Sequence, residues 1–255
     1  MRTAASALLA KEEGHLHLQD KEACEALLDG YRQSLEEGGR PFVLEEEHKW
    51  LREMALGELR DPVRFWAKMD ALPRITGKLP NKVQNSLDRL MPERGLEYRT
   101  VRRVAGLGSL GHVRTVALAE CHGGKIAREA KALAPSAIHW VEGENGRLKL
   151  LYQAILERAV RDPDPFVELR GSWIVRRLSP HCSRIELSVL PRNRDEMHLL
   201  YAMGWETANI HLGSASARKK ILRHLRQLKP LQIYNAARDM AKAVTHDWRA
   251  WKGAS

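Results

Sequence analysis

The stretch GLGSLG at residues 106–111, together with Lys131 further along the chain, decides the fold of this protein. Its glycines, Gly106, Gly108 and Gly111, lack side chains at points where backbone N–H groups can approach a bound group closely. The group bound at such a loop is most often a phosphate. The same spacing also occurs in ordinary hairpin turns, so the flanking sequence has to separate the alternatives.

Two phosphate-binding folds use this spacing, and they differ in the element that comes after the loop. In a dinucleotide-binding domain the loop leads from a strand into a helix, whereas in a kinase it joins two antiparallel strands and a lysine on the third strand reaches the phosphates. Residues 112–120 are rich in β-branched side chains and lack a helical period, and residues 125–131 follow a turn at 121–124. The sequence therefore predicts three antiparallel strands within residues 96–131, as in a kinase. A helix beginning at 110–114 would instead indicate the dinucleotide fold.

The flanking regions complete the fold prediction. Residues 1–95 read as helical, residues 96–180 hold the sheet with one helix at 147–160, and residues 181–255 return to helix. Two further strands within residues 166–178 make a hairpin. We therefore expect an α+β fold, with a five-stranded antiparallel sheet that resembles a kinase small lobe, flanked by N-terminal and C-terminal helical regions.

Helix starts can be located in the first region. Asp20 is expected to cap a helix, because a short polar side chain can accept hydrogen bonds from the first backbone N–H groups. Asp61 followed by Pro62 predicts a second cap, since proline is favoured at the first helical position. Residues 14–20, GHLHLQD, echo a loop of small-molecule kinases, but histidine and aspartate replace the aspartate and asparagine that the loop needs. We interpret them as a helix–helix connection.

Composition and charge narrow the class of protein. The chain has 255 residues, of which 44% are hydrophobic and 29% charged, as is typical of a soluble globular protein. Its formal net charge of +10 favours an anionic partner, which can be a nucleotide, a nucleic acid or a phosphorylated substrate. The 3 cysteines form no C-x-x-C pair, which fits a reducing cytoplasm. No apolar run approaches the roughly 18 residues that a membrane helix needs, so no membrane partner is expected.

A basic segment near the C-terminus indicates a second class of function. The helix expected at residues 217–229 carries cations and no acidic residue on one side: Arg218, Lys219, Lys220, Arg223 and Arg226. Such a face is either a solvated surface or a binding site for a polyanion. The alternative to a nucleotide-binding protein is therefore a basic nucleic-acid-binding or scaffold protein, in which the glycine loop is only a hairpin.

Separate stretches of the chain together resemble one bacterial family. They are residues 104–111 (VAGLGSLG), 128–131 (REAK) and 203–213 (MGWETANIHLG), supported by residues 173–178 (WIVRRL). These stretches are similar to domain-of-unknown-function family 2252, an uncharacterised group whose motifs look distantly kinase-like. The resemblance runs over most of the chain, from about Arg2 onward.

The resemblance implies a nucleotide-phosphate cradle that binds ATP. Backbone groups of the loop would meet the phosphates at Gly106, Gly108, Ser109 and Gly111. Lys131 would supply positive charge, and in kinases a glutamate on the following helix orients this lysine. The candidates for that glutamate are Glu142, Glu144 and Glu157. Glu142 is preferred, because residues 141–143 (VEG) resemble a triplet of the family.

The chain also departs from this family. Members carry upstream G-D-x-H-x-x-N and F-D-x-N-D-F-D stretches, which resemble the catalytic and metal-binding loops of small-molecule kinases, whereas this chain begins after them. We therefore expect a truncated or split member without phosphotransfer activity or bound Mg²⁺ of its own, complemented by an N-terminal half encoded upstream. No catalytic residue or metal ligand is assigned, because Asp239 and Asp247 lack the paired spacing. Glu129 stands where kinases place a small residue against the adenine ring, which puts that pose of the base in doubt.

Overall fold

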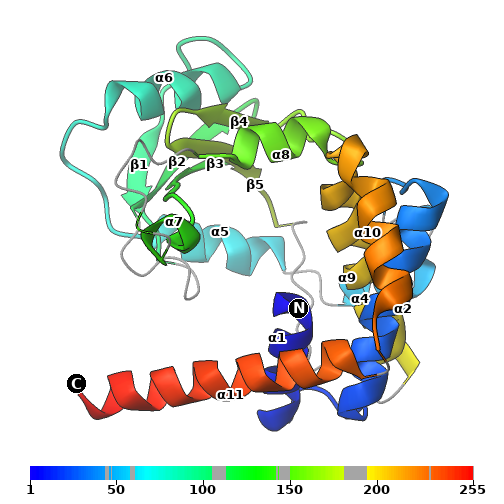
Figure 1. Ribbon diagram of the computed structural model, residues 1–255. Helices are drawn as coiled ribbons and strands as arrows, with labels where there is room; N and C mark the ends of the chain where they lie inside the picture. The colour runs from blue at the N-terminus through cyan, green and yellow to red at the C-terminus, as the bar shows by residue number, and fades with distance from the viewer. Residues whose placement is uncertain are drawn as a thin grey trace. The chain divides into compact units, whose positions relative to one another are not determined.

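The chain forms two compact units in a computed structural model that describes residues 1–43, 46, 48–57, 61–104, 113–141, 143, 150–180, 194–229 and 231–254. The helical unit consists of Met1–Met54, Ala154–Asp162 and Ile185–Ser255. The sheet unit consists of Ala55–Gln153 and Pro163–Arg184. The two ends of the chain therefore belong to one unit, although the sheet unit separates them along the sequence (Figure 1).

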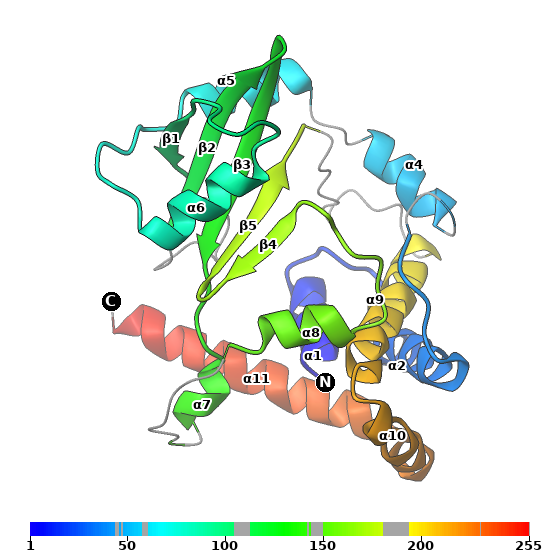
Figure 2. The same cartoon turned by 90° about the horizontal axis from the view of Figure 1, so that it is seen from above.

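The sheet unit contains the five-stranded antiparallel sheet that the sequence predicts, so the α+β expectation is confirmed (Figure 2). Its strands are β1 (Arg99–Arg102), β2 (Arg114–Cys121), β3 (Gly124–Ala132), β4 (Val167–Arg170) and β5 (Trp173–Leu178). They lie in the order β1-β2-β3-β5-β4, and each neighbouring pair is antiparallel. Because a strand rather than a helix follows the glycine-rich segment, the strand–loop–helix order of a dinucleotide-binding domain is excluded.

Helices cover both faces of this sheet. Successive side chains of a strand point to opposite faces, and each face carries apolar side chains that pack against a helix. α6 (Asn81–Leu90) lies against one face and α5 (Pro62–Asp70) against the other (Figure 1). The α6 side packs Val83, Leu87, Met91, Ala117, Ala119, Ala130 and Val175. The α5 side packs Phe65, Met69, Val101, Val116, Leu118 and Ala127. Beyond Ala127 this second face becomes polar, and a short helix, α7 (Ala137–Val141), follows β3.

Two helix caps can be compared with their predictions. Asp61 caps α5 as predicted, because its side chain accepts a hydrogen bond from the backbone N of Val63 at 2.9 Å. The prediction for Asp20 is wrong, since Gln19 caps α2 (Asp20–Glu37) through a capping box. Asp20 is the first helical residue instead, where the helix dipole favours its negative charge.

The other helices belong wholly or mostly to the helical unit. They are α1 (Arg2–Glu12), α2, α4 (Lys49–Gly57), α8 (Tyr152–Arg158), α9 (Arg194–Leu212), α10 (Ala215–Gln227) and α11 (Gln232–Gly253). α8 begins later than the helix predicted at 147–160, because Leu150 and Leu151 are not helical and residues 144–149 lie outside the described residues. No helix within the described ranges is both long enough and apolar enough to cross a membrane.

Residues 14–19 connect α1 to α2, as predicted, and Asp20 is already the first residue of α2. The connection is held by Glu196, a buried residue in the first turn of α9. Its carboxylate accepts hydrogen bonds from the backbone N of His17 at 3.0 Å and of Leu18 at 3.2 Å. A buried carboxylate needs such donors, because an unpaired charge away from water is strongly unfavourable.

The backbones of α2 and α9 approach each other closely. A Cβ atom at Gly204 of α9 would lie 2.0 Å from the carbonyl O of Leu27, and one at Gly30 of α2 would lie 2.0 Å from the carbonyl O of Tyr201. No side chain can be accommodated at such a distance. Glycine at both positions is therefore what allows these helices to pack.

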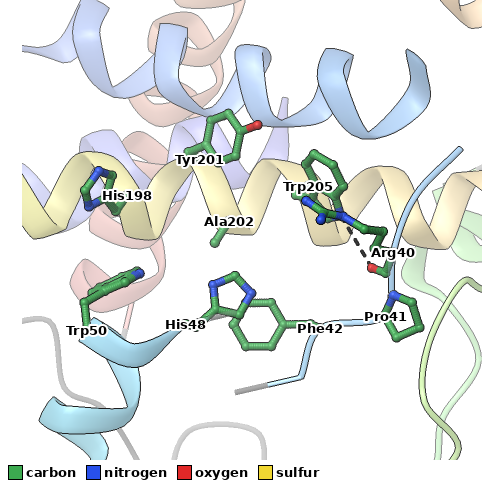
Figure 3. Close-up of a pocket in the computed structure, with 9 residues that line it drawn as sticks. All are labelled: Arg40, Pro41, Phe42, His48, Trp50, His198, Tyr201, Ala202 and Trp205. Atoms are coloured by element: carbon green, nitrogen blue, oxygen red, sulfur yellow. Dashed lines mark hydrogen bonds between the residues drawn. The ribbon is translucent and has the colours of Figure 1, made fainter. Parts of the chain in front are cut away.

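The segment that leaves α2 is held against α9. Nε1 of Trp205 donates to the carbonyl O of Arg40 at 3.4 Å (Figure 3). Nδ2 of Asn209 donates to the same oxygen at 2.7 Å. Because this carbonyl accepts two hydrogen bonds from α9, the backbone at Arg40 has a defined position.

We expect Gly204→Ala to destabilise the helical unit, because the added Cβ would meet the carbonyl O of Leu27. In an open helix the same change stabilises by about 1 kcal/mol, whereas overpacking costs about 1–3 kcal/mol. The sign of the change in the free energy of unfolding, measured in urea, therefore shows whether the two backbones are this close. Gly253→Ala is the control, since an added Cβ there meets no atom within 4 Å. Equal stability of the two variants would contradict this packing.

Candidate functional site

The site is a group of charged side chains on the sheet face that α5 partly covers. Cross-strand partners point to the same face, so the register of the strands decides which residues meet. Lys131 of β3 lies opposite Arg114 of β2, and Glu129 lies opposite Arg176 of β5. Glu129 and Lys131 are two positions apart in one strand and therefore share this face. The sheet thus brings together charges that are distant in the sequence.

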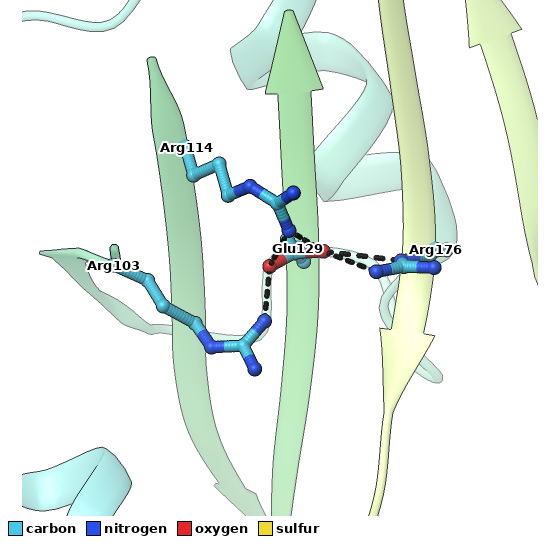
Figure 4. Close-up of polar contacts among 4 residues, drawn as sticks. All are labelled: Arg103, Arg114, Glu129 and Arg176. Carbon is cyan, nitrogen blue, oxygen red and sulfur yellow. Dashed lines mark hydrogen bonds and ion pairs between the residues drawn. The ribbon is translucent and has the colours of Figure 1, made fainter. Parts of the chain in front are cut away.

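Glu129 is at the centre of this site, with a side chain that is 0% exposed. Its Oε2 accepts hydrogen bonds from Nε and Nη2 of Arg176 at 3.0 and 2.9 Å. Nη1 of Arg114 lies 3.3 Å from Oε1 and 3.4 Å from Oε2. Arg103, which directly follows β1, donates to Oε1. Three guanidinium groups of the described residues therefore converge on one carboxylate (Figure 4).

The pKa of Glu129 follows from these surroundings. Burial acts to raise the pKa of this carboxyl, because desolvation disfavours its charged form. The positive charges of Arg103 and Arg176, and the hydrogen bonds that they donate, outweigh burial and hold the pKa below its ordinary value. Glu129 is therefore charged at neutral pH, but it can balance only one of the guanidinium groups around it.

At this site the side chains of Arg114 and Lys131 have hydrogen-bond donors without a partner among the described residues. Arg114 is 8% exposed, and its Nε has no hydrogen-bond partner among the described residues. Lys131 is half-buried, and its side chain forms no ion pair or hydrogen bond with another residue in the described part of the chain. Like charges directly opposite each other in a sheet repel. An anion placed next to both side chains would therefore stabilise the pair.

The described residues on either side of the glycine-rich segment belong to this site. The backbone N of Arg103 donates to the carbonyl O of Arg114 at 3.2 Å, which joins the two residues that flank the segment. The predicted cradle residues themselves lie outside the described residues: Gly106, Gly108, Ser109 and Gly111. Their contact with a phosphate stays a prediction.

The partner predicted for Lys131 also stays a prediction. Glu142, the preferred candidate, and Glu144 lie outside the described residues. Glu157 is an exposed residue of α8 and belongs to the helical unit, whereas Lys131 belongs to the sheet unit. Among the described residues of the sheet unit, Glu129 is a carboxylate that shares the face of Lys131.

Sequence reasoning singled out Lys131 and Glu129 but missed the arginines. A usable signal was present in β2 and β3, where Arg114 and Glu129 interrupt runs of small and apolar residues. A charged side chain at an inward position of a strand has to be paired, so opposite signs on neighbouring strands indicate a contact. Arg103 carries no such signal, because it lies beyond the end of β1.

A second group of side chains lies at the turn between β2 and β3. Ligand atoms of Glu93, Cys121 and His122 lie within 4.8 Å of one another, and Nε2 of His122 is 2.6 Å from Oε1 of Glu93. Desolvation and the nearby charge of Glu93 raise the pKa of the Cys121 thiol. Because metals bind the thiolate, a raised pKa weakens this group as a metal site. We assign no metal to it.

Comparisons with protein-family models, with curated proteins and with solved structures find no match for this chain. Guanidinium groups bind phosphate or carboxylate through paired hydrogen bonds, and an ammonium group adds a point charge. The arrangement around Glu129 is thus suited to binding an anion.

We expect Glu129→Gln to destabilise the sheet unit by about 3–5 kcal/mol, because the three guanidinium groups lose their shared carboxylate and the charge of Arg114 stays buried without it. The depressed pKa also predicts a pH dependence. The stability that Glu129 contributes is present above its pKa in the unfolded chain, and it is lost as the pH falls through the lower pKa of the folded state. The variant should lack this loss.

Urea unfolding from neutral to acidic pH measures both effects. Glu120→Gln is the control, because Glu120 is an exposed residue of β2 and its removal should change little. If Glu129→Gln were as stable as wild type at neutral pH, the carboxylate would not hold the arginines together.

Proposed function

We propose that the sheet unit binds the phosphate groups of a nucleotide, with ATP as the expected ligand, on the cationic face around Glu129. The observation that supports this proposal is the excess of positive charge around one buried carboxylate. Arg103, Arg114 and Arg176 share one carboxylate, and Lys131 has no partner among the described residues. The glycine-rich segment beside them would add backbone N–H donors.

The arginines differ in how far solvent reaches them. Side-chain exposure rises from 9% at Arg114 through 17% at Arg103 to 47% at Arg176. A phosphate would approach from the exposed side and meet Nε of Arg114, which has no partner within the described ranges, at the buried side. Glu129 would hold the guanidinium groups in place before the ligand arrives. Such preorganisation lowers the cost of ordering side chains on binding.

The proposal is for binding without phosphoryl transfer by this chain. Transfer needs a residue that acts on the substrate hydroxyl and carboxylates that hold Mg²⁺. On the described part of this face, Glu129 is engaged by arginines, and Asp70 pairs with Arg99 at 2.6 Å and with Lys125 at 2.5 Å. Glu129 and Asp70 thus serve as counter-ions, while Glu120 lies opposite Lys125 and is exposed. This agrees with the resemblance to domain-of-unknown-function family 2252, whose catalytic stretches have no counterpart in this sequence.

Titration of the purified chain with a fluorescent ATP analogue tests the proposal. We expect wild type to bind, and Lys131→Ala to weaken binding by about 1–3 kcal/mol, the contribution of one charged hydrogen bond. Lys125→Ala is the matched control, because Lys125 lies on the same strand and face but already pairs with Asp70. Equal affinities of wild type and Lys131→Ala, or no binding by either, would overturn the proposal.

Glu129→Gln separates a binding role of the site from a structural one. The variant is expected to be less stable, but its arginines no longer share a carboxylate and should bind phosphate more tightly. Inorganic phosphate should therefore raise the melting temperature of Glu129→Gln more than that of wild type, since a ligand of the folded state stabilises it by mass action. A purely structural cluster would give the same shift in both proteins.

The basic face of α10 favours a second candidate function, which is binding of nucleic acid. Exposed cations on this helix form no ion pair with another described residue: Lys219, Lys220, Arg223 and Arg226. Arg218 differs from them, because it donates to the carbonyl O of Leu35 at 2.7 Å and of Glu36 at 2.8 Å. It therefore anchors α10 to the end of α2, while the other cations face solvent.

Replacing Lys219, Lys220 and Arg223 together by glutamine should weaken binding of duplex DNA and flatten its salt dependence. Each cation that contacts a phosphate contributes about one unit to the slope of log affinity against log salt. Fluorescence polarisation of labelled DNA at several salt concentrations measures this slope. Lys131→Ala is the control and should bind as wild type does. Failure of wild type to bind DNA at low salt would exclude this second function.

A further inference from the structure

A cavity of about 320 Å³ lies in the helical unit, between α9 and the segment that leads from α2 to α4. Its aromatic lining consists of Phe42, His48, Trp50, His198, Tyr201 and Trp205 (Figure 3). The volume is at the lower end of the range for small-molecule sites. The cavity therefore fits a single ring system better than a long or branched ligand.

Residues 40–42 form the wall opposite α9, and residues of the stretch 203–213 hold this wall in place. The proposed phosphate site in the sheet unit does not involve this stretch. Trp205 and Asn209 both donate to the carbonyl O of Arg40. Asn209 is 1% exposed and also donates to Glu206 at 2.6 Å, so its amide has a fixed orientation. The guanidinium of Arg40 lies over the ring of Trp205, 5.1 Å from its centre. These contacts preform one end of the cavity.

The interior of the cavity lies between the stacked rings of Phe42 and His48 on one side and Ala202 on the other. Phe42 and His48 stack with ring centres 3.9 Å apart and 12° between their planes. Ala202 points toward this pair from α9 (Figure 3). Trp50 and His198 close the other end, with ring centres 5.8 Å apart. A flat ring can enter where the methyl group of Ala202 leaves room.

These features select one class of ligand. Flat aromatic surfaces favour a planar ring, and the imidazole nitrogens of His198 can exchange hydrogen bonds with ring nitrogens. The site is less suited to a quaternary ammonium ion, which aromatic cages often bind, because Arg40 already covers the face of Trp205 and none of the described lining residues is acidic. We propose that this cavity binds a planar heteroaromatic ring of the size of a purine base.

Isothermal titration calorimetry of the full chain with adenine tests this proposal. We expect wild type to bind, and Trp50→Ala to weaken binding about five- to hundredfold, the effect of removing one ring on which a base stacks. Ala202→Leu should abolish binding by filling the space beside Phe42 and His48. Met203→Leu is the control, because it places the same side chain at the next position of α9, which is exposed.

Further controls keep the result specific to this cavity. The melting temperature of each variant shows whether it is folded, and Lys131→Ala should bind adenine unchanged because adenine has no phosphate. Wild-type binding that both Trp50→Ala and Ala202→Leu leave unchanged would place the ring elsewhere and overturn the proposal. Absence of binding at millimolar adenine would overturn it as well.

Two more ligands test the chemistry of the ring. Naphthalene-2-methanol offers a similar ring area without ring nitrogens, and equal affinity for it would overturn the heteroaromatic assignment. Tighter binding of benzyltrimethylammonium would replace that assignment by a cation site.

A purine ring can come from a free nucleoside or from a single-stranded nucleic acid. Displacement of adenine by adenosine or by a short deoxyadenosine oligonucleotide supports the proposal and identifies the source, whereas displacement by neither overturns it.

Discussion

One buried carboxylate, that of Glu129, joins parts of the sheet that are distant in sequence. Arg103 directly follows β1, Arg114 begins β2 and Arg176 belongs to β5, and each donates to this carboxylate. The carboxylate could not be buried without these partners, because desolvation disfavours its charge. The arginines, in turn, would repel one another without it. The stability of the polar half of this sheet face therefore depends on this interaction.

The imbalance of charge distinguishes this cluster from a simple structural ion pair. A buried pair of one arginine and one glutamate would carry no net charge and would give no reason to expect an anion. Here several guanidinium groups share Glu129, Nε of Arg114 has no partner among the described residues, and Lys131 lies opposite Arg114. The same residues that hold the strands together thus carry a net positive charge, for which Glu129 is the internal counter-ion.

The helical unit follows a different principle, in which backbone contacts place aromatic side chains. Gly30 and Gly204 let α2 and α9 pack backbone to backbone, and the carbonyl O of Arg40 is then held by two donors from α9. The aromatic cavity results from these contacts. Its ring walls come from segments on both sides of the sheet unit in the sequence, so no local pattern marks them as neighbours.

Much of the fold could be predicted from the sequence, because it depends on residues close together in the chain. The β-branched flanks of residues 106–111 determined strands rather than a helix, and Asp61 before Pro62 determined the start of α5. The prediction placed the cap of α2 one residue too late, since the side chains of Gln19 and Asp20 can both accept hydrogen bonds from the first turn. By itself, the sequence thus determined the strands, the helices and the prominence of Lys131. Only the tertiary structure decided that Arg114, Glu129 and Arg176 meet and that an aromatic cavity forms on α9, because strand register and helix packing join segments that carry no local signal of their contact.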